Sequence, residues 1–196
     1  MKNYQYTVAS LPELVPGAAA GVPDTDAVIA EIRESCDKRD NELLDFLVRS
    51  FSDENLTEDF YREALAHGNS FIREYFAFDL KVRNAKVRHL NTALSRPAGQ
   101  DEIVLSEEEE EEDGFARIFS GKDIIAREKA VDDLYWEKLD ELSLMHYFDM
   151  NVIMAFILKL RIVNRWNLLD EAAGREMFRR LVEEVRGTFK GVGAES

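Results

Sequence analysis

Two aspartates, Asp79 and Asp149, have the residue type and setting that could support chemistry. Each follows a phenylalanine in a repeated phrase, FDLKVRNA from Phe78 and FDMNVIMA from Phe148, with four of eight positions identical. A pair of carboxyl groups can perform general acid–base catalysis, as in glycoside hydrolases. No spacing in the sequence sets the separation that such catalysis needs, and no nearby motif supplies a substrate pocket. We therefore expect both aspartates to serve helix packing, and we expect no catalytic residue.

The histidines do not follow a metal-binding pattern. A di-iron helical bundle places a glutamate three residues before each ligating histidine. Here His67, His89 and His146 are preceded at that spacing by an alanine, a lysine and a serine. We therefore expect no metal site.

Nucleophile and phosphate-binding motifs are also missing from the sequence. The Gly121-Lys122 pair lacks the upstream glycine that a Walker motif requires. The single cysteine, Cys36, lies in a charged helical region without a neighbouring histidine, so we expect an inert thiol and a reducing, cytoplasmic environment. We expect no cofactor.

Helical periodicity dominates the elements that must position the two aspartates. An apolar stripe predicts a helix over about 70–93 that carries the first phrase, and a largely apolar helix over about 144–166 carries the second. Similar patterns predict helices over about 121–143 and 175–189. Only the alternation at the start of the chain, residues 4–8, indicates a short extended segment. The sequence predicts an all-α fold.

The repeated phrase indicates two similar helical bundle units related by duplication. We expect an N-terminal unit at 1–96, an acidic flexible linker at 97–114, a C-terminal unit at 115–190 and a disordered tail at 191–196. Deleting residues 101–113 should then leave thermal stability nearly unchanged, and the helices that carry the two phrases should superpose.

Most of the net charge of −14 comes from the linker. Residues 100–114 hold nine acidic and no basic residues, which leaves 30 acidic and 25 basic residues elsewhere. Nucleic-acid binding needs a positive footprint, so we expect no nucleic-acid partner. The apolar runs are shorter than the roughly 18 residues that a membrane span needs, and we expect neither a signal peptide nor a transmembrane helix.

The two aspartates require partners if they are ionised on an apolar face. Arg83 lies four positions after Asp79, the spacing of a helical ion pair. Ile153 occupies the equivalent position after Asp149, so the partner of Asp149 should come from elsewhere. Candidates are Arg161, Arg165 or a group in the other unit.

A basic stretch lies at the end of the first repeated helix. As a solvated face it would complement the helix C-terminus, and as a docking site it would bind an acidic protein partner. Its residues are Lys81, Arg83, Lys86 and Arg88.

The segments NYQYTVASLPEL, EYFAFDLKVRN and YFDMNVIMAFILKLRIVNRWN resemble a family of small bacterial proteins encoded alongside V-type ATPase subunits. The two repeated helices also resemble the C-type central-stalk component of V-type and archaeal-type rotary ATPases, which is named d-type in eukaryotes. This resemblance implies a non-catalytic helical component that links the rotor shaft to the membrane ring in ion transport. Such a protein would be cytoplasmic, or peripheral at the cytoplasmic face of the membrane through its partners. The C-type family has three similar helical units and this chain has room for about two, so a socket and a peripheral or assembly role both remain open.

Two other hypotheses stay beside the V-type ATPase role. The chain could be a helical protein-interaction adaptor of an unrelated cytosolic complex. It could also be an enzyme with a site made from scattered residues, which would require a deep pocket that joins Asp79 or Asp149 to Arg83, His89 or His146. The sequence leaves open which part of the ATPase is contacted, which ion is transported and whether the chain self-associates.

Overall fold

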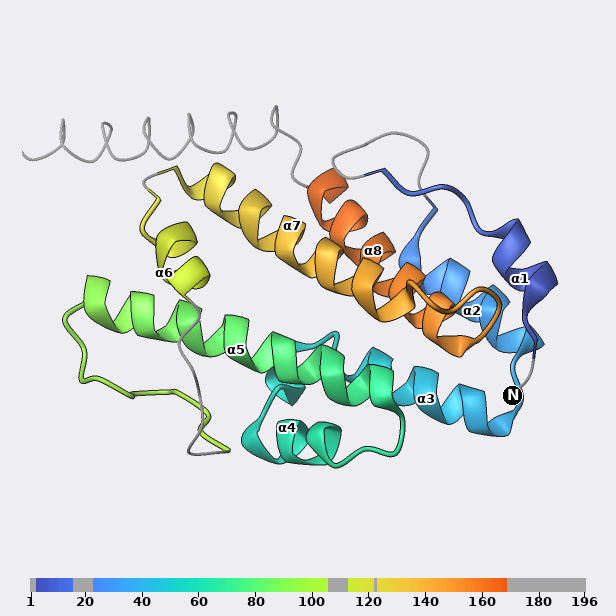
Figure 1. Ribbon diagram of the computed structural model, residues 1–196, viewed down its shortest axis with the longest axis horizontal. Coiled ribbons are helices and arrows are strands. Elements are labelled where there is room, and N and C mark those ends of the chain that lie inside the picture. The colour runs from blue at the N-terminus through green and yellow to red at the C-terminus, as the bar shows by residue number, and fades with distance from the viewer. Residues whose placement is uncertain (1–2, 16–22, 106–112, 122, 169–196) are drawn as a thin grey trace, which may run out of the picture.

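The computed structural model describes residues 3–15, 23–105, 113–121 and 123–168 (Figure 1). Within these ranges the chain is all-helical and has no strand, which confirms the predicted fold class. None of the helices in the described ranges is both long and apolar enough to cross a membrane. The elements are α1 (Gln5–Ser10), α2 (Thr25–Ser35), α3 (Lys38–Arg49), a 3-10 turn η1 (Asp53–Asn55), α4 (Glu58–Leu65), α5 (Ser70–Ala93), α6 (Asp113–Phe119), α7 (Ile124–Ser143) and α8 (Met150–Leu168).

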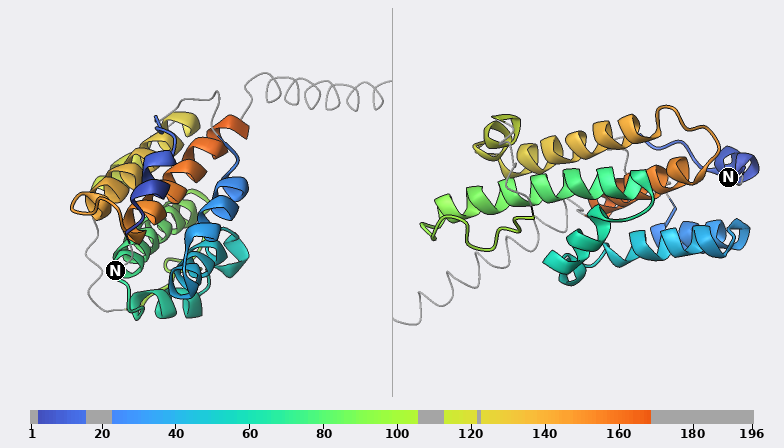
Figure 2. Two further views of the ribbon diagram at one scale, coloured as in Figure 1. Left: turned by 90° about the vertical axis from the view of Figure 1, so that its right-hand side faces the viewer. Right: turned by 60° about the horizontal axis from the view of Figure 1, so that its bottom comes forward.

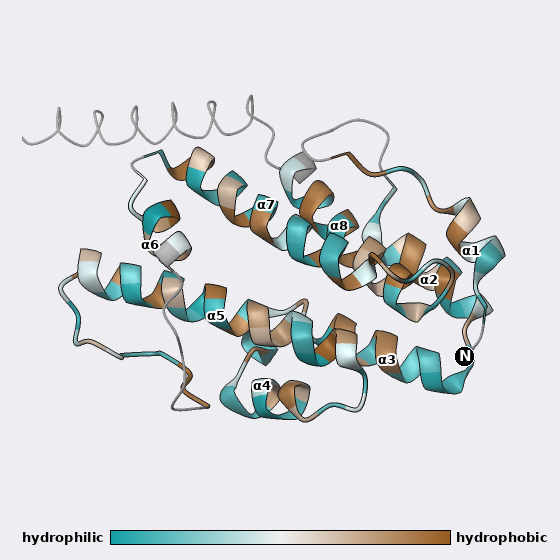
Figure 3. Cartoon of the chain, in the orientation of Figure 1, coloured by the Kyte–Doolittle hydropathy of each residue, from teal (hydrophilic) through white to brown (hydrophobic). Residues whose placement is uncertain are grey.

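Long helices α5, α7 and α8 form the centre of the fold (Figures 1 and 2). Helix α7 packs against α8 and α5, while α2 and α3 contact α8 and the short α4 covers α5. Each of these helices carries hydrophobic and hydrophilic residues along its length (Figure 3). This pattern lets one side of each helix enter the core while the other faces water.

Side-chain caps fix where several helices begin. The Asp24 carboxylate accepts hydrogen bonds from the backbone N–H groups of Asp26 and Ala27 at 3.1 Å, and the Asn69 side chain accepts one from Ile72 N–H at 3.2 Å. Such caps satisfy N–H groups that have no partner within the helix, and each contributes about 1 kcal/mol. Because Asn69 caps α5, the helix begins at the predicted residue, and its bounds Ser70–Ala93 match the predicted range of 70–93.

The core joins the two predicted units. Buried residues of α2 to α5 and of α7 and α8 belong to one continuous hydrophobic cluster. Phe76 is fully buried, and its ring lies 5.0 Å from those of Phe60 and Tyr75 and 5.9 Å from that of Phe46, measured between centroids. The segments on either side of the acidic run therefore pack on each other.

The predicted start of α8 is wrong. The helix begins at Met150, so Phe148 and Asp149 precede it and do not lie within it, whereas Phe78 and Asp79 lie in the interior of α5. Aspartate is a good helix-capping residue, and the carboxylate of Asp149 accepts a hydrogen bond from Asn151 N–H at 3.0 Å. The two copies of the phrase thus occupy different local structures.

The predicted extended start is also wrong, because residues 5–10 form α1. Tyr4, which directly precedes α1, is buried, whereas Tyr6 is 92% exposed. The alternating residues therefore do not share one buried face, as they would in a strand. The sequence also did not predict α6, which begins at the end of the proposed linker.

Part of the proposed flexible linker is packed against α5. The side-chain amide of Asn84 donates to Ile103 O at 2.8 Å and its oxygen accepts from Ile103 N–H at 3.1 Å. Asn91 donates to Gln100 O at 2.7 Å, and Ile103 is buried. Residues 97–105 are therefore part of the fold. The remaining predictions for the acidic run at 106–112, the helix at 175–189 and the tail at 191–196 fall outside the described residues.

Candidate functional site

Asp79 is held by two tyrosines from neighbouring helices. Tyr61 of α4 donates a hydrogen bond to Asp79 Oδ2 at 2.6 Å, and Tyr135 of α7 donates to Oδ1 at 2.7 Å. Tyr61 is fully buried. Asp79 therefore links α5 to α4 and α7.

Burial controls the protonation of this cluster. It raises the pKa of Asp79, and the hydrogen bonds from the tyrosines and the charges of Arg83 and Arg161 oppose this shift only in part. Burial likewise raises the pKa of Tyr61 and Tyr135, and the nearby Asp79 carboxylate adds to the effect. The cluster consequently favours protonated tyrosines that donate to one carboxyl group.

Arg83 is not the ion-pair partner that the sequence predicted for Asp79. Its guanidinium donates instead to Asp101 O at 3.0 Å and, at 3.4 Å, to Asn84. The four-residue spacing permits an ion pair but does not enforce one. Here the backbone of residues 97–105 offers Arg83 an acceptor, while the tyrosines satisfy Asp79.

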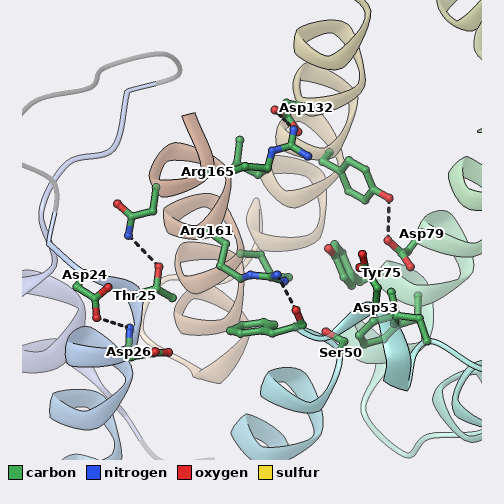
Figure 4. A pocket seen from close by; sticks show the side chains of 17 residues that line it. Asp24, Thr25, Asp26, Ser50, Asp53, Tyr75, Asp79, Asp132, Arg161 and Arg165 are labelled. Carbon is green, nitrogen blue, oxygen red and sulfur yellow. Dashed lines mark hydrogen bonds and ion pairs between the residues drawn. The ribbon is translucent and has the colours of Figure 1, made fainter. Parts of the chain in front are cut away.

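A cleft of about 600 Å³ opens beside Asp79 (Figure 4). Helices α2, α5, α7 and α8 and the turn after α3 form its walls. Its lining is Asp24, Thr25, Asp26, Ser50, Phe51, Asp53, Leu56, Tyr75, Phe76, Asp79, Asp132, Tyr135, Leu158, Arg161, Ile162, Asn164 and Arg165.

The two arginines of α8 that face this cleft have different partners. Arg165 forms an ion pair with Asp132, which is buried and also accepts a hydrogen bond from the indole of Trp166 at 2.5 Å. Arg161 donates to Phe51 O at 3.0 Å, and its guanidinium lies 4.0 Å from the centre of the Phe51 ring.

Neither arginine pairs with Asp149, so these two candidate partners are wrong. Asp149 Oδ2 lies 2.5 Å from His146 Nδ1, and Oδ1 accepts the Asn151 N–H described above. Because Asp149 stands before the first turn of α8, its neighbours come from the loop and not from the helix face.

Pairing within the chain occupies much of the basic stretch. Arg88 contacts Glu102 at 2.8 Å and Lys86 lies 3.6 Å from Glu128 of α7. Lys81 is exposed on α5. These pairs and the Arg83 contacts attach the basic stretch to neighbouring parts of the chain, and both interpretations of it stay predictions.

The enzyme hypothesis required a pocket that joins particular residues, and the large cleft contains only one of them. Asp79 lines it, but Arg83, His89 and Asp149 do not. His146 lines a smaller hollow of about 190 Å³ near the start of α5, beside Phe71 and Glu74. The two aspartates of the repeated phrase are therefore not brought together as a catalytic pair in these pockets.

A group of exposed apolar side chains lies at one end of the molecule. We call it the apolar end: Tyr6 (92% exposed), Leu144 (71%), Met145 (79%), Tyr147 (70%) and Phe148 (42%). The loop between α7 and α8 supplies four of these residues, and Tyr4 N–H donates to Phe148 O at 2.7 Å, which holds the start of α1 against this loop (Figure 2). By contrast Phe78, the first-copy counterpart of Phe148, is half-buried and packs on Tyr135 with ring centroids 5.4 Å apart.

Sequence reasoning missed the tyrosines that bind Asp79 and the cleft-lining role of Arg161. The contacts of Tyr61 and Tyr135 to Asp79 span 18 and 56 positions. Local spacing carries no signal for such contacts. Tyr75 lies four positions before Asp79, so its place on the same face of α5 could have been found from helical spacing.

Comparison with known protein families gives a match over the second half of the chain. No curated protein and no solved structure matches the chain. Residues 96–188, which include α6, α7 and α8, are similar to a family described as "Protein of unknown function (DUF2764)".

Proposed function

We propose that this protein is a non-catalytic component of a V-type ATPase, similar to its C-type central-stalk component, that contacts the rotor shaft or the membrane ring and serves ion transport. The resemblance of the segments around Asp79 and Asp149 to V-type ATPase-associated proteins supports this choice of complex. The apolar end is the observation that carries the role in binding a protein partner.

The composition of the apolar end suits a protein interface. Two tyrosines, a phenylalanine, a methionine and a leucine are exposed within one loop and the adjacent α1. Interface cores are enriched in aromatic residues and methionine. Their position at an end of the long helices suits end-on contact with another protein of the complex (Figure 1).

The polar clusters of the interior support a structural role for the repeated phrase. Both oxygens of Asp79 accept tyrosine hydrogen bonds, and Asp132 is held by Arg165 and Trp166. Groups that satisfy one another in this way tie α4, α5, α7 and α8 together. They position the α7–α8 loop, and with it the apolar end.

The test is affinity purification of the tagged protein from detergent-solubilised membranes of its native host, followed by mass spectrometry. We expect stalk and ring subunits of the V-type ATPase among the proteins recovered. A Leu144→Ser, Tyr147→Ser double variant should lose them. Both side chains are exposed, and a surface substitution typically changes the free energy of unfolding by about 0.5 kcal/mol or less. The free energy of unfolding of the double variant should therefore lie within about 1 kcal/mol of the wild-type value.

A matched control lies at the other end of α7. Ile124 and Ile125 are 65% and 69% exposed, and the 20 residues of α7 place them about 30 Å from the apolar end. The Ile124→Ser, Ile125→Ser variant should retain the ATPase subunits. Recovery of an unrelated set of cytosolic proteins by the wild type, lost in the apolar-end variant, would favour the adaptor function and contradict the ATPase role.

The place in the cell follows from the same proposal. A component of this complex would be cytoplasmic and held at the cytoplasmic face of the membrane through its partners. Fractionation should recover it with membranes that contain the ATPase and release it when the complex is dissociated. In a strain that lacks the ATPase, the protein should not be recovered with the membranes.

A further inference from the structure

Two polar groups that line the 600 Å³ cleft form no hydrogen bond or ion pair with Asp79 or Asp132 in the described part of the chain. The first is the hydroxyl of Tyr75. Tyr75 is only 8% exposed, and its ring packs between Phe71, Phe76 and Tyr135. Its hydroxyl has no hydrogen-bond partner among the residues that the structure describes. A buried hydroxyl without a partner is costly to the fold, so such groups commonly mark the place of a ligand.

The second group is the guanidinium of Arg161. It is half-buried and donates to Phe51 O, but no carboxylate of the described part of the chain lies within 4.0 Å of it. Burial lowers the pKa of Arg161, and the negative charge of Asp53 acts in the opposite direction. A guanidinium has five N–H donors and binds carboxylates in a two-pronged geometry.

Arg161 and Tyr75 offer their donors to the same space. Figure 4 shows them directed toward one another from α8 and α5, and both line the cleft. Tyr75 brings an O–H group and Arg161 its remaining N–H groups. This pair is suited to hold an oxyanion such as a carboxylate.

Acidic residues surround this pair of donors at the rim of the cleft. Asp24, Asp26 and Asp53 are exposed lining residues, and Asp53 interacts electrostatically with Arg161. Their negative charge disfavours a ligand that is only an anion. A ligand with a cationic group on the same small skeleton would be attracted by the rim and by the donors at once.

We propose that the cleft is a binding site for a small zwitterion of the amino-acid class, with its carboxylate on Arg161 and Tyr75 and its ammonium group facing the acidic rim. The volume of the cleft falls in the range of about 300–1,000 Å³ that is usual for small-molecule sites. This site is independent of the apolar end and of the role in a V-type ATPase.

The test is isothermal titration calorimetry of the full chain with each of the common free amino acids. Acetate and ethylamine at the same ionic strength serve as probes for a carboxylate or an ammonium group alone. We expect measurable heat with at least one amino acid, and at least tenfold weaker binding of acetate and ethylamine. The absence of binding of every amino acid up to about 10 mM, roughly tenfold weaker than a millimolar dissociation constant, would overturn the proposal. Acetate that binds as tightly as the amino acid would overturn the zwitterion assignment.

Variants place the ligand within the cleft. Tyr75→Phe removes only the buried hydroxyl and should weaken binding at least tenfold, and Arg161→Gln should abolish it. Tyr61→Phe is the matched control, because it also removes a buried hydroxyl, but one that bonds Asp79 and does not line the cleft. It should bind with the wild-type affinity. If Arg161→Gln does not fold, Tyr75→Phe decides the matter, and an unchanged affinity of a folded Tyr75→Phe protein would refute the site.

Discussion

Asn84 is the residue whose replacement tests the packing of residues 97–105 most sharply. It is fully buried on α5, and its side-chain amide both donates to and accepts from the backbone of Ile103. Asn84→Ala removes both hydrogen bonds together. It leaves the N–H and C=O groups of Ile103 without these partners in a largely buried place.

The magnitude follows from these contacts. Two hydrogen bonds contribute about 1 kcal/mol each, and a buried polar group left without a partner costs about 1–3 kcal/mol unless it reaches water. The loop can move outward, so part of this cost is relieved while some burial of the Ile103 side chain is lost. We expect a loss of about 3 kcal/mol in the free energy of unfolding. For a domain of this size this corresponds to roughly 6–12 °C in Tm.

Urea unfolding followed by circular dichroism measures this loss, and amide hydrogen exchange at Ile103 reports the loop itself. The Ile103 N–H should be protected in the wild type and exchange rapidly in the variant. Val104→Ala is the control, because Val104 is 62% exposed, and it should change stability by less than about 0.5 kcal/mol. A loss below about 1 kcal/mol for Asn84→Ala, with unchanged exchange, would refute the reasoning and support a free linker. For the same reason we expect deletion of residues 101–113 to destabilise the fold, contrary to the expectation from composition.

Three further predictions concern the core and the repeated phrase. Burial raises the folded-state pKa of Asp79, so its contribution to stability is full below the ordinary aspartate pKa of about 3.9 and is lost as the pH rises through the folded-state pKa. Asp79→Asn should therefore flatten this part of the profile of stability against pH. Urea unfolding at several pH values measures the profile, and an unchanged profile in the variant would contradict the prediction. Phe76→Ala should lower the free energy of unfolding by about 4 kcal/mol, measured with urea, since Phe76 is fully buried among aromatic rings. Tyr6→Ala, at a 92% exposed position, should lower it by less than about 0.5 kcal/mol. Equal losses would argue against this core. Asp149→Ala should lose about 1 kcal/mol by removal of the bond to Asn151 N–H, and a Tm equal to that of the wild type would show that this contact does not cap α8.

Local periodicity predicted the helices of the centre well. The apolar stripe of α5 and the capping residue Asn69 agree on the same start, so the predicted and observed bounds coincide. In α8 the apolar positions continue upstream through Met145 and Phe148, and periodicity alone cannot separate a buried helix from an exposed apolar loop. The position of Asp149 as a cap therefore had to come from the structure.

The candidate site was predictable only in part. The sequence singled out Asp79 as a carboxylate in need of a partner, and helical spacing suggested Arg83. The true partners, Tyr61 and Tyr135, come from other helices, and their positions depend on how α4 and α7 pack on α5. Arg161 was considered only as a partner of Asp149, because nothing in the sequence shows that α2, α5 and α8 enclose a cleft.

Photo-crosslinking from the apolar end in the native host tests the proposed function most directly. Tyr147 is 70% exposed, and its replacement with benzoyl-phenylalanine keeps an aromatic ring at the same place; the same amino acid at Ile125, 69% exposed on α7, is the control. Irradiation followed by mass spectrometry should give a crosslink from position 147, but not from position 125, to a shaft or ring protein of the V-type ATPase. Crosslinks from position 147 only to proteins outside that complex would contradict the proposed function.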